Sequence, residues 1–170
     1  MQSNPNFESA IEYVLSNEGL FVDNKDDAGG PTNMGITLKD LQRFRKIPVT
    51  RDDLIELTKD EAKQLYYEFF WHPLYLDSLP VKIATAIFDM SINQGPYSAI
   101  RLAQRACQVA DDGNLGPKTI MALQDINPQL FIENYVDAIQ DKYCDICLNL
   151  PTQLQFLKGW LRRSRKMFRL

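Results

Sequence analysis

The sequence has little histidine and cysteine, and it has no long apolar segment. It contains 170 residues, with a single histidine, His72, and three cysteines. A structural zinc site needs about four ligands, and His72 lies far in sequence from the Cys144 and Cys147 pair. We therefore expect neither a metal nor a cofactor. No apolar run approaches the roughly 18 residues of a membrane span. Residues 1–5 lack the basic and apolar regions of a secretory signal peptide, so we expect a protein made in the cytoplasm.

Two of the cysteines are spaced as C-x-x-C. Cys144 and Cys147 fall in a segment with helical periodicity, residues 131–148, where positions i and i+3 share one face. We interpret them and Cys107 as core or half-buried thiols. A metal or redox role is the alternative that the spacing leaves open.

Acidic residues are absent from the C-terminal segment, residues 146–170, although the whole chain has a formal net charge of −3. This basic end predicts contact with an anionic polymer or surface. Its large apolar residues recur at helical spacing, so we expect a core-packed helix with a solvated basic face; binding to anionic cell wall or outer-membrane lipid is the alternative. The basic residues are Lys158, Arg162, Arg163, Arg165, Lys166 and Arg169, and the apolar stripe is Leu157, Trp160, Leu161 and Phe168.

Helical periodicity dominates the rest of the sequence. Residues 20–36 are rich in Gly, Asp and Asn and read as a loop with one short hairpin. Asn4, Thr37, Thr58 and Asn127 precede helical segments as N-caps. The fold class is therefore mainly α, with at most one small β-hairpin near this loop. The predicted helices span residues 5–18, 38–44, 59–71, 81–93, 97–109, 118–124, 128–150 and 153–168.

Glu18 is the first candidate for chemistry. It follows an amphipathic helix, and the partial negative charge of a helix C-terminus disfavours an ionised carboxylate. A raised pKa suits a general acid that protonates a glycosidic oxygen, while a second carboxylate stays ionised. Asp23, Asp26 and Asp27 on the following loop are candidates for that second group. Ordinary turn chemistry and a calcium loop are the alternatives, although the regular spacing of an EF-hand is absent.

A sequence signature covers the same stretch. Glu18-Gly19-Leu20-Phe21, followed by Asp27-x-Gly-Gly-x-Thr32-x-x-Gly-Ile-Thr37, resembles the E-G-G-Y…D-x-G-G-x-T-x-x-G-I-T opening of the glycoside hydrolase 108 family of N-acetylmuramidases. The resemblance implies that Glu18 is the proton donor. Glu18, Asp27 and Thr32 also resemble, less strictly, the Glu–Asp–Thr arrangement of phage-type lysozymes in another glycosidase family. By this analogy, Asp27, helped by Thr32, activates water or stabilises charge. Phe21, which replaces the family's Tyr, and Thr37 are predicted to contact substrate.

Three further motifs resemble the predicted peptidoglycan-binding region of that family. The resemblance implies substrate contacts for Asn93, Gln94 and Asp112. The structural alternatives are a helix C-cap with Gly95 and a turn in which Asp112 caps the next helix. The motifs are F-D-x-x-V-N-x-G at residues 88–95, with Ile92 in place of the Val, D-G-x-x-G-P-x-T at residues 112–119, and F-x-x-G-W-x-x-R at residues 156–163.

The sequence thus predicts a lysozyme-like, mainly α, monomeric enzyme. Residues 1–80 form a catalytic muramidase region and residues 81–170 a peptidoglycan-binding region packed with it as one compact unit. The expected reaction is cleavage of the β-1,4 bond between N-acetylmuramic acid and N-acetylglucosamine. Its expected partners are peptidoglycan glycan strands and a holin or similar pore, for action in the periplasm or cell wall during phage lysis or holin-linked secretion; no nucleic acid is expected.

Two other functions are kept as alternatives. One is a non-catalytic peptidoglycan-binding protein, in which the region around Asp112 carries the function and Glu18 is incidental. The other is a membrane-active protein that works through its basic C-terminal helix.

Overall fold

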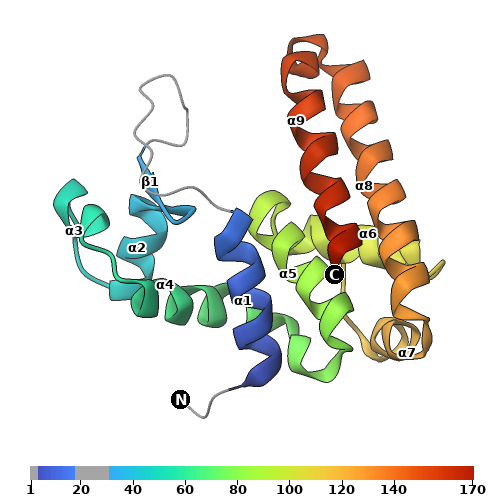
Figure 1. The fold of residues 1–170 in the computed structure, drawn as a ribbon, viewed down its shortest axis with the longest axis horizontal. Helices are drawn as coiled ribbons and strands as arrows, with labels where there is room; N and C mark the ends of the chain where they lie inside the picture. The colour runs from blue at the N-terminus through green and yellow to red at the C-terminus, as the bar shows by residue number, and fades with distance from the viewer. Residues whose placement is uncertain (1–3, 18–30) are drawn as a thin grey trace. The chain divides into compact units, whose positions relative to one another are not determined.

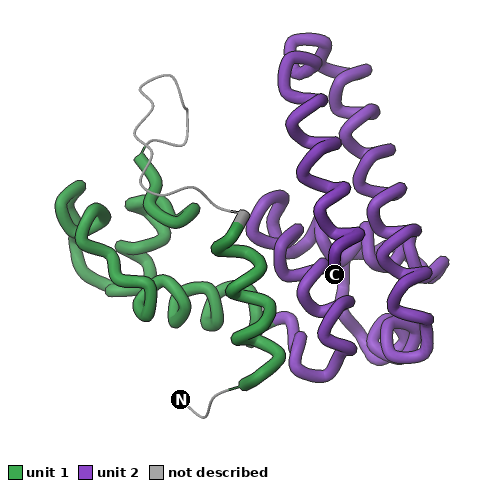
Figure 2. Tube along the Cα trace, viewed as in Figure 1, with its two compact units in different colours: residues 1–73 green, residues 74–170 purple. Residues whose placement is uncertain are grey.

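The protein is mainly α-helical, as the periodicity predicts. The computed structural model describes residues 4–17 and 31–170, and in these residues helices dominate around one two-stranded hairpin (Figure 1). None of the helices described combines the length and the apolar character needed to cross a membrane. The chain divides into two compact units, residues 1–73 and 74–170 (Figure 2). The predicted boundary between a catalytic and a binding region at residues 80 and 81 stays a prediction.

Local sequence signals start most elements of the first unit. The Asn4 side chain accepts hydrogen bonds from the backbone N–H groups of Asn6 and Phe7 at 3.0 and 3.2 Å, which confirms the predicted cap. Thr37 forms a capping box with Asp40. The elements are α1 (Pro5–Asn17), β1 (Thr32–Asn33), β2 (Ile36–Thr37), α2 (Leu38–Arg45), α3 (Arg51–Ile55), α4 (Lys59–Tyr66) and a π-helical turn, η1 (Tyr67–Trp71).

Two features of the first unit differ from the prediction. The short helix α3 was not predicted, although Thr50 and Asp53 form a capping box at its start. The segment predicted as a single helix to residue 70 or 71 changes from α to π geometry after Tyr66. In this π turn, the Trp71 side chain is fully buried, so the wider turn places a large ring in the core.

Arg45 joins three helices of the first unit through its guanidinium group. Its Nε and Nη2 donate to the Glu61 carboxylate at 2.7 and 2.9 Å, and its Nη1 donates to Asp53 at 2.9 Å. These contacts help to lower the pKa of both carboxyl groups: Arg45 is the main cause at Glu61, whereas Thr50 is the main cause at Asp53. The cluster ties α2 to α3 and α4.

Replacing Arg45 is expected to reduce stability in a pH-dependent way. Carboxyl groups with a lowered pKa in the folded state stabilise it above their unfolded pKa, and this contribution is lost as the pH falls through the folded pKa. Arg45→Gln should therefore lower the melting temperature by about 2–4 °C at pH 7, or roughly 1 kcal/mol, with a smaller difference at pH 3. Circular dichroism at both pH values measures this; a difference that grows on acidification contradicts it.

The second unit is a helical bundle around α5. Every residue from Ile83 to Ser91 in this helix is buried, and α6 and α8 pack against it. Helices α8 and α9 form a long hairpin (Figure 1). The elements are 3₁₀ turn η3 (Leu76–Ser78), α5 (Val81–Gln94), α6 (Pro96–Ala106), α7 (Pro117–Asp125), α8 (Pro128–Asn149), 3₁₀ turn η4 (Pro151–Gln153), α9 (Leu154–Ser164) and 3₁₀ turn η5 (Arg165–Arg169).

A buried ion pair connects the first and last helices of this bundle. Asp89 on α5 is 2% exposed, and its carboxylate accepts a hydrogen bond from Nη2 of Arg163 on α9 at 3.2 Å. Burial, followed by the charge of Asp89, raises the pKa of the neighbouring Tyr135 well above its usual value. Asp89 and Arg163 are the Asp and the final Arg of two of the sequence motifs, so these motifs meet inside the bundle.

The apolar stripe of the last helix is less buried than predicted. Leu157, Trp160 and Leu161 are half-buried against their neighbours, so the expected core-packed face is confirmed only in part, and it is wrong for Phe168, which is exposed. The helix tightens to 3₁₀ geometry at Arg165, where residues three apart line up. Met167 is therefore buried in place of Phe168.

One cysteine also departs from the prediction. Cys107 is half-buried and Cys147 is buried, as expected, but Cys144 is exposed. Position 144 lies beyond the edge of the buried face of α8, which includes Tyr143 and Cys147.

Candidate active site

The β1–β2 hairpin begins directly after the segment that carries most of the candidate catalytic residues. Glu18, Phe21 and Asp27 lie outside the residues that the structure describes, and their roles stay predictions. Thr32 and Thr37 face each other across the antiparallel pair. Met34 and Gly35 connect the strands with φ angles of 50° and 79°, which a tight two-residue hairpin turn requires. The hairpin thus fixes Thr32 next to Thr37.

Two side chains anchor this hairpin to the helices below it. Nδ2 of buried Asn33 donates to the carbonyl oxygens of Leu54 and Ile55 at 2.9 and 3.3 Å. The Tyr66 hydroxyl on α4 donates to the carbonyl oxygen of Met34 at 2.7 Å. Sequence reasoning missed both residues, because each bond spans more than 20 positions of the chain and leaves no local pattern.

Helix α1, which ends directly before Glu18, is fixed to the same helix α4. Its Glu8 and Glu12 carboxylates lie 2.7 and 3.1 Å from Nζ of Lys63. The Phe7 ring packs edge-on against Tyr67, with 5.0 Å between the ring centroids. Residues of α4 therefore hold both α1 and the hairpin, the two elements that flank the candidate catalytic segment.

Thr37 has a structural role in addition to its predicted contact with substrate. Its hydroxyl donates to the Asp40 carboxylate at 2.6 Å and accepts from the Asp40 backbone N–H at 3.1 Å. This capping box starts α2 and holds the second strand in place. The substrate contact of Thr37 stays a prediction, as does the catalytic role of Thr32.

The Asp112 loop of the second unit is organised around a buried amide. Oδ1 of Asp112 accepts hydrogen bonds from Nε2 of Gln104 and from the Asn114 backbone N–H, both at 2.8 Å. Oε1 of Gln104 accepts from the Gly113 N–H at 2.8 Å, and its Nε2 also donates to the Thr119 hydroxyl at 3.1 Å. Asp112 thus builds the turn, but it does not cap α7, whose N-cap is Gly116.

Gly113 fits this loop because its conformation excludes most side chains. Its φ is +78°, and an added Cβ would lie 2.2 Å from Cε2 of Tyr97. Gly113→Ala is therefore expected to destabilise the protein by about 1–3 kcal/mol. Differential scanning calorimetry measures this. Gly116→Ala is the matched control, since Gly116 has φ −87° and open space around it; equal losses in the two variants would show that the loop conformation is unimportant.

Asn93 and Gln94 lie at the end of α5. Nδ2 of Asn93 donates to the Asp89 carbonyl oxygen one turn earlier, at 2.7 Å, and Gln94 is the last helical residue before Gly95, which has φ +81°. The structure thus shows the predicted helix end at Gly95. Both side chains are only half-buried, and their contact with substrate stays a prediction.

The aromatic residues in and around η1 differ in burial. Tyr66 and Trp71 are in the core, whereas Tyr67, Phe69 and Phe70 are half-buried and Tyr75 is exposed. Tyr75 is a candidate for stacking on a sugar face. In the described part of the chain, no group of three His, Cys, Asp or Glu side chains is placed to hold a metal ion.

Comparison with known proteins matches nearly the whole chain. The family model described as glycosyl hydrolase 108 matches residues 11–95, and the model described as predicted peptidoglycan domain matches residues 98–165. The solved structure of Brucella abortus SagA is similar, with 32% sequence identity, a TM-score of 0.82 and coverage of 98% of this chain and 93% of SagA. No curated protein matches. The two family matches meet where α5 gives way to α6.

Proposed function

This chain belongs to the glycosyl hydrolase 108 family, and we propose that it is an N-acetylmuramidase, a lysozyme that cleaves the β-1,4 bond between N-acetylmuramic acid and N-acetylglucosamine. The coarser activity follows from the family: the protein is a glycoside hydrolase of peptidoglycan with a C-terminal binding region. The proposal specifies the bond and the residues that act on it.

The observation that carries the proposal is the match of the hydrolase family across Glu18, Asp27 and Thr32. In the proposed reaction, the Glu18 carboxyl group donates its proton to the leaving glycosidic oxygen. Asp27, helped by Thr32, activates the water or stabilises the positive charge that develops on the sugar ring. Of these three residues the structure describes Thr32, and the hairpin that carries it is anchored to α3 and α4, as a catalytic group requires.

The products of peptidoglycan digestion test the proposed bond. A muramidase leaves N-acetylmuramic acid at the new reducing end, which borohydride converts to the corresponding alditol; a glucosaminidase leaves reduced N-acetylglucosamine instead. Mass spectrometry of reduced muropeptides distinguishes the two. An anhydro-sugar product would show that the reaction is transglycosylation and not hydrolysis. Intact glycan strands would favour the non-catalytic binding protein. Digestion in ¹⁸O-labelled water, followed by rapid anomer analysis, reports inversion or retention.

Among the three loop aspartates, Asp27 is expected to be the most sensitive to substitution. Asp27→Asn should reduce lysis of purified cell walls less than a change at Glu18 but more than Asp23→Asn or Asp26→Asn, because only Asp27 matches the family motif. Loss of wall turbidity measures the rates. The largest loss at Asp23 or Asp26 would assign the second catalytic role to that residue.

EDTA should leave the lysis rates of all these variants unchanged, because no metal site is expected. Inhibition by EDTA would favour a calcium loop.

We also propose that the protein reaches its substrate through a holin or similar pore, because peptidoglycan lies outside the cytoplasmic membrane. Co-expression tests this route: lysis of the host should require both the hydrolase and the pore. Lysis without a pore would require another export mechanism.

We propose in addition that the enzyme is a monomer. Light scattering, which measures the mass of the protein in solution, tests this.

A further inference from the structure

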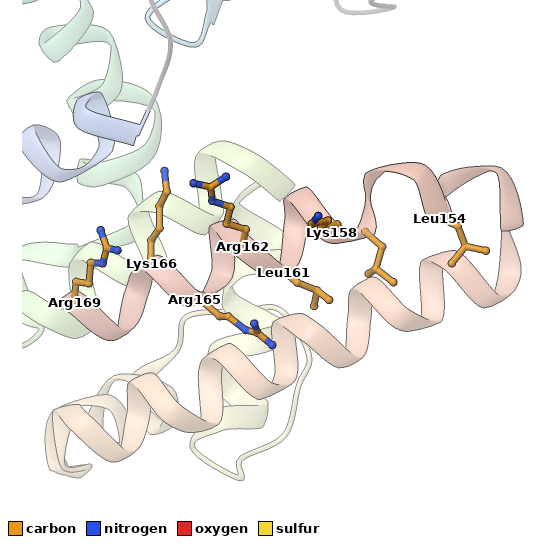
Figure 3. A pocket seen from close by; sticks show the side chains of 8 residues that line it. Leu154, Lys158, Leu161, Arg162, Arg165, Lys166 and Arg169 are labelled. Carbon is orange, nitrogen blue, oxygen red and sulfur yellow. The ribbon is translucent and has the colours of Figure 1, made fainter.

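The surface of α9 combines apolar and basic side chains in one groove. The groove has a volume of about 710 Å³, and the described residues that line it include Leu154, Leu157, Leu161, Lys158, Arg162 and Arg165. Figure 3 shows Leu154 near the start of the helix and the basic residues along the turns that follow. Among the described lining residues none is acidic, so the groove has a positive potential.

Large apolar side chains are exposed at the adjoining end of the α8–α9 hairpin. Leu148 is 79% exposed, Leu150 and Leu154 are each 57% exposed, and Phe156 is 48% exposed. They lie on both sides of the short turn η4, and this end of the hairpin extends beyond the other helices of the second unit (Figure 1). We call these four residues the apolar end of the hairpin.

The basic residues that line the groove are available to a partner. Lys158, Arg162, Arg165 and Arg169 are exposed. Arg163 differs from them, because its guanidinium group bonds to buried Asp89. Four exposed cationic side chains thus follow one another along α9 and η5 within twelve positions, and the first of them, Lys158, is one helical turn after exposed Leu154.

We propose that the apolar end and the basic groove of α9 form a membrane-binding surface for anionic phospholipid bilayers. The leucine and phenylalanine side chains enter the boundary between head groups and acyl chains. With α9 and η5 along the membrane plane, the lysine and arginine side chains lie at the level of the lipid phosphates. Interfacial helices bind through this combination of buried apolar area and cationic charge.

A lipid surface explains the observations better than an anionic polysaccharide. Cations alone would suffice to bind a charged polymer, and a hydrated sugar chain gains little from exposed leucine side chains. Burial of apolar side chains in acyl chains, in contrast, is favourable in proportion to the area removed from water. The placement of four apolar residues at the free end of the hairpin therefore favours a bilayer. This surface requires no catalytic residue, so it is independent of the proposed muramidase reaction.

Trp160 can serve as an intrinsic fluorescent probe of vesicle binding. Of its two tryptophans, Trp71 is fully buried, whereas Trp160 lies half-buried on α9, 6.0 Å from the Phe156 ring. Titration of the full chain with phosphatidylcholine vesicles containing 30% phosphatidylglycerol should shift the tryptophan emission to shorter wavelength. Pure phosphatidylcholine vesicles should give little or no shift. Co-sedimentation with the same vesicles measures the affinity independently.

Two matched pairs of variants separate the basic and apolar contributions. Arg162→Gln with Arg165→Gln should weaken vesicle binding about 10–30-fold at low salt, whereas Lys82→Gln with Lys118→Gln removes the same charge elsewhere in the unit and should change little. Leu154→Gln with Phe156→Gln should also weaken binding at least about tenfold. Its control is Met121→Gln with Leu130→Gln, which are 61% and 48% exposed on other helices.

Binding that is selective for anionic vesicles, lost in both α9 variants and kept in both controls, supports the proposal. Absence of vesicle binding overturns it, as does an equal loss in α9 and control variants. Binding of purified peptidoglycan that depends on the α9 residues, without vesicle binding, also overturns it, because the partner of this surface is then the polymer. Melting temperatures of all variants show that each protein remains folded.

Discussion

Glu18→Gln is expected to remove most of the lytic activity and to leave the fold intact. Glutamine keeps the size and the hydrogen-bonding capacity of glutamate, but it has no proton to transfer to the leaving glycosidic oxygen. General acid catalysis typically contributes about 10²–10⁴-fold to a rate, so the rate of wall lysis should fall by that factor. Turbidity loss of purified cell walls measures it, and a melting curve checks the fold.

The control for this variant is binding. Co-sedimentation of Glu18→Gln with insoluble peptidoglycan should match that of the unaltered protein, since the predicted binding region lies elsewhere in the sequence. Lysis at a near-normal rate would show that Glu18 is not the proton donor. Loss of lysis and of binding together would indicate that the substitution disturbs more than proton transfer.

Separation of the ion pair between Asp89 and Arg163 is expected to cause the largest loss of stability. Arg163→Met removes the cation and leaves the buried Asp89 carboxylate without this partner. Removal of one member of a buried ion pair typically costs about 3–5 kcal/mol, a large share of the roughly 5–15 kcal/mol stability of a domain. Urea unfolding, monitored by circular dichroism, measures the change.

A double-mutant cycle separates the ion pair from the general effect of altered packing. Asp89→Leu combined with Arg163→Met removes both charges, and apolar replacements of a buried pair are often neutral or even stabilising. The double variant should therefore be more stable than either Asp89→Leu or Arg163→Met alone. Additive losses would show that the two residues stabilise the protein through separate contacts.

The sequence was sufficient to predict elements that begin with a local signal. Asn4, Thr37, Thr58 and Asn127 all accept hydrogen bonds from the first turn of their helices, as expected. The hairpin was predicted from its Gly- and Asn-rich composition. These signals act within three or four residues, so one segment of the sequence contains the whole pattern.

Features that depend on distant partners could not be predicted in the same way. The π turn follows α4 without a local breaker, and its buried Trp71 ring lies 5.4 Å from the Phe7 ring in α1. Phe168 matches the helical period of its segment, but tightening of the last turn exposes it. Met167 is buried instead. In each case packing against another element decides the outcome, and periodicity within one segment does not describe that packing.

The candidate site also combines residues that a local motif indicates with residues that depend on distant partners. The motif selects Glu18, Asp27 and Thr32 as candidates, because family signatures are local in sequence, and their roles stay predictions. The residues that support the site, Asn33 and Tyr66, make bonds to positions 21 and 32 residues away. The Gln104 amide organises the Asp112 loop through hydrogen bonds to residues eight and nine positions further along the chain.

The uneven exposure of the three cysteines makes this protein suitable for site-selective chemical labelling without an engineered thiol. Thiol reagents react with the accessible thiolate form. Cys147 is buried, and burial raises the pKa of half-buried Cys107 to about 11, whereas Cys144 is exposed on α8. A maleimide fluorophore added briefly at neutral pH will therefore attach at Cys144 first. One dye per molecule, one helical turn before Leu148, then reports on the environment of the hairpin end.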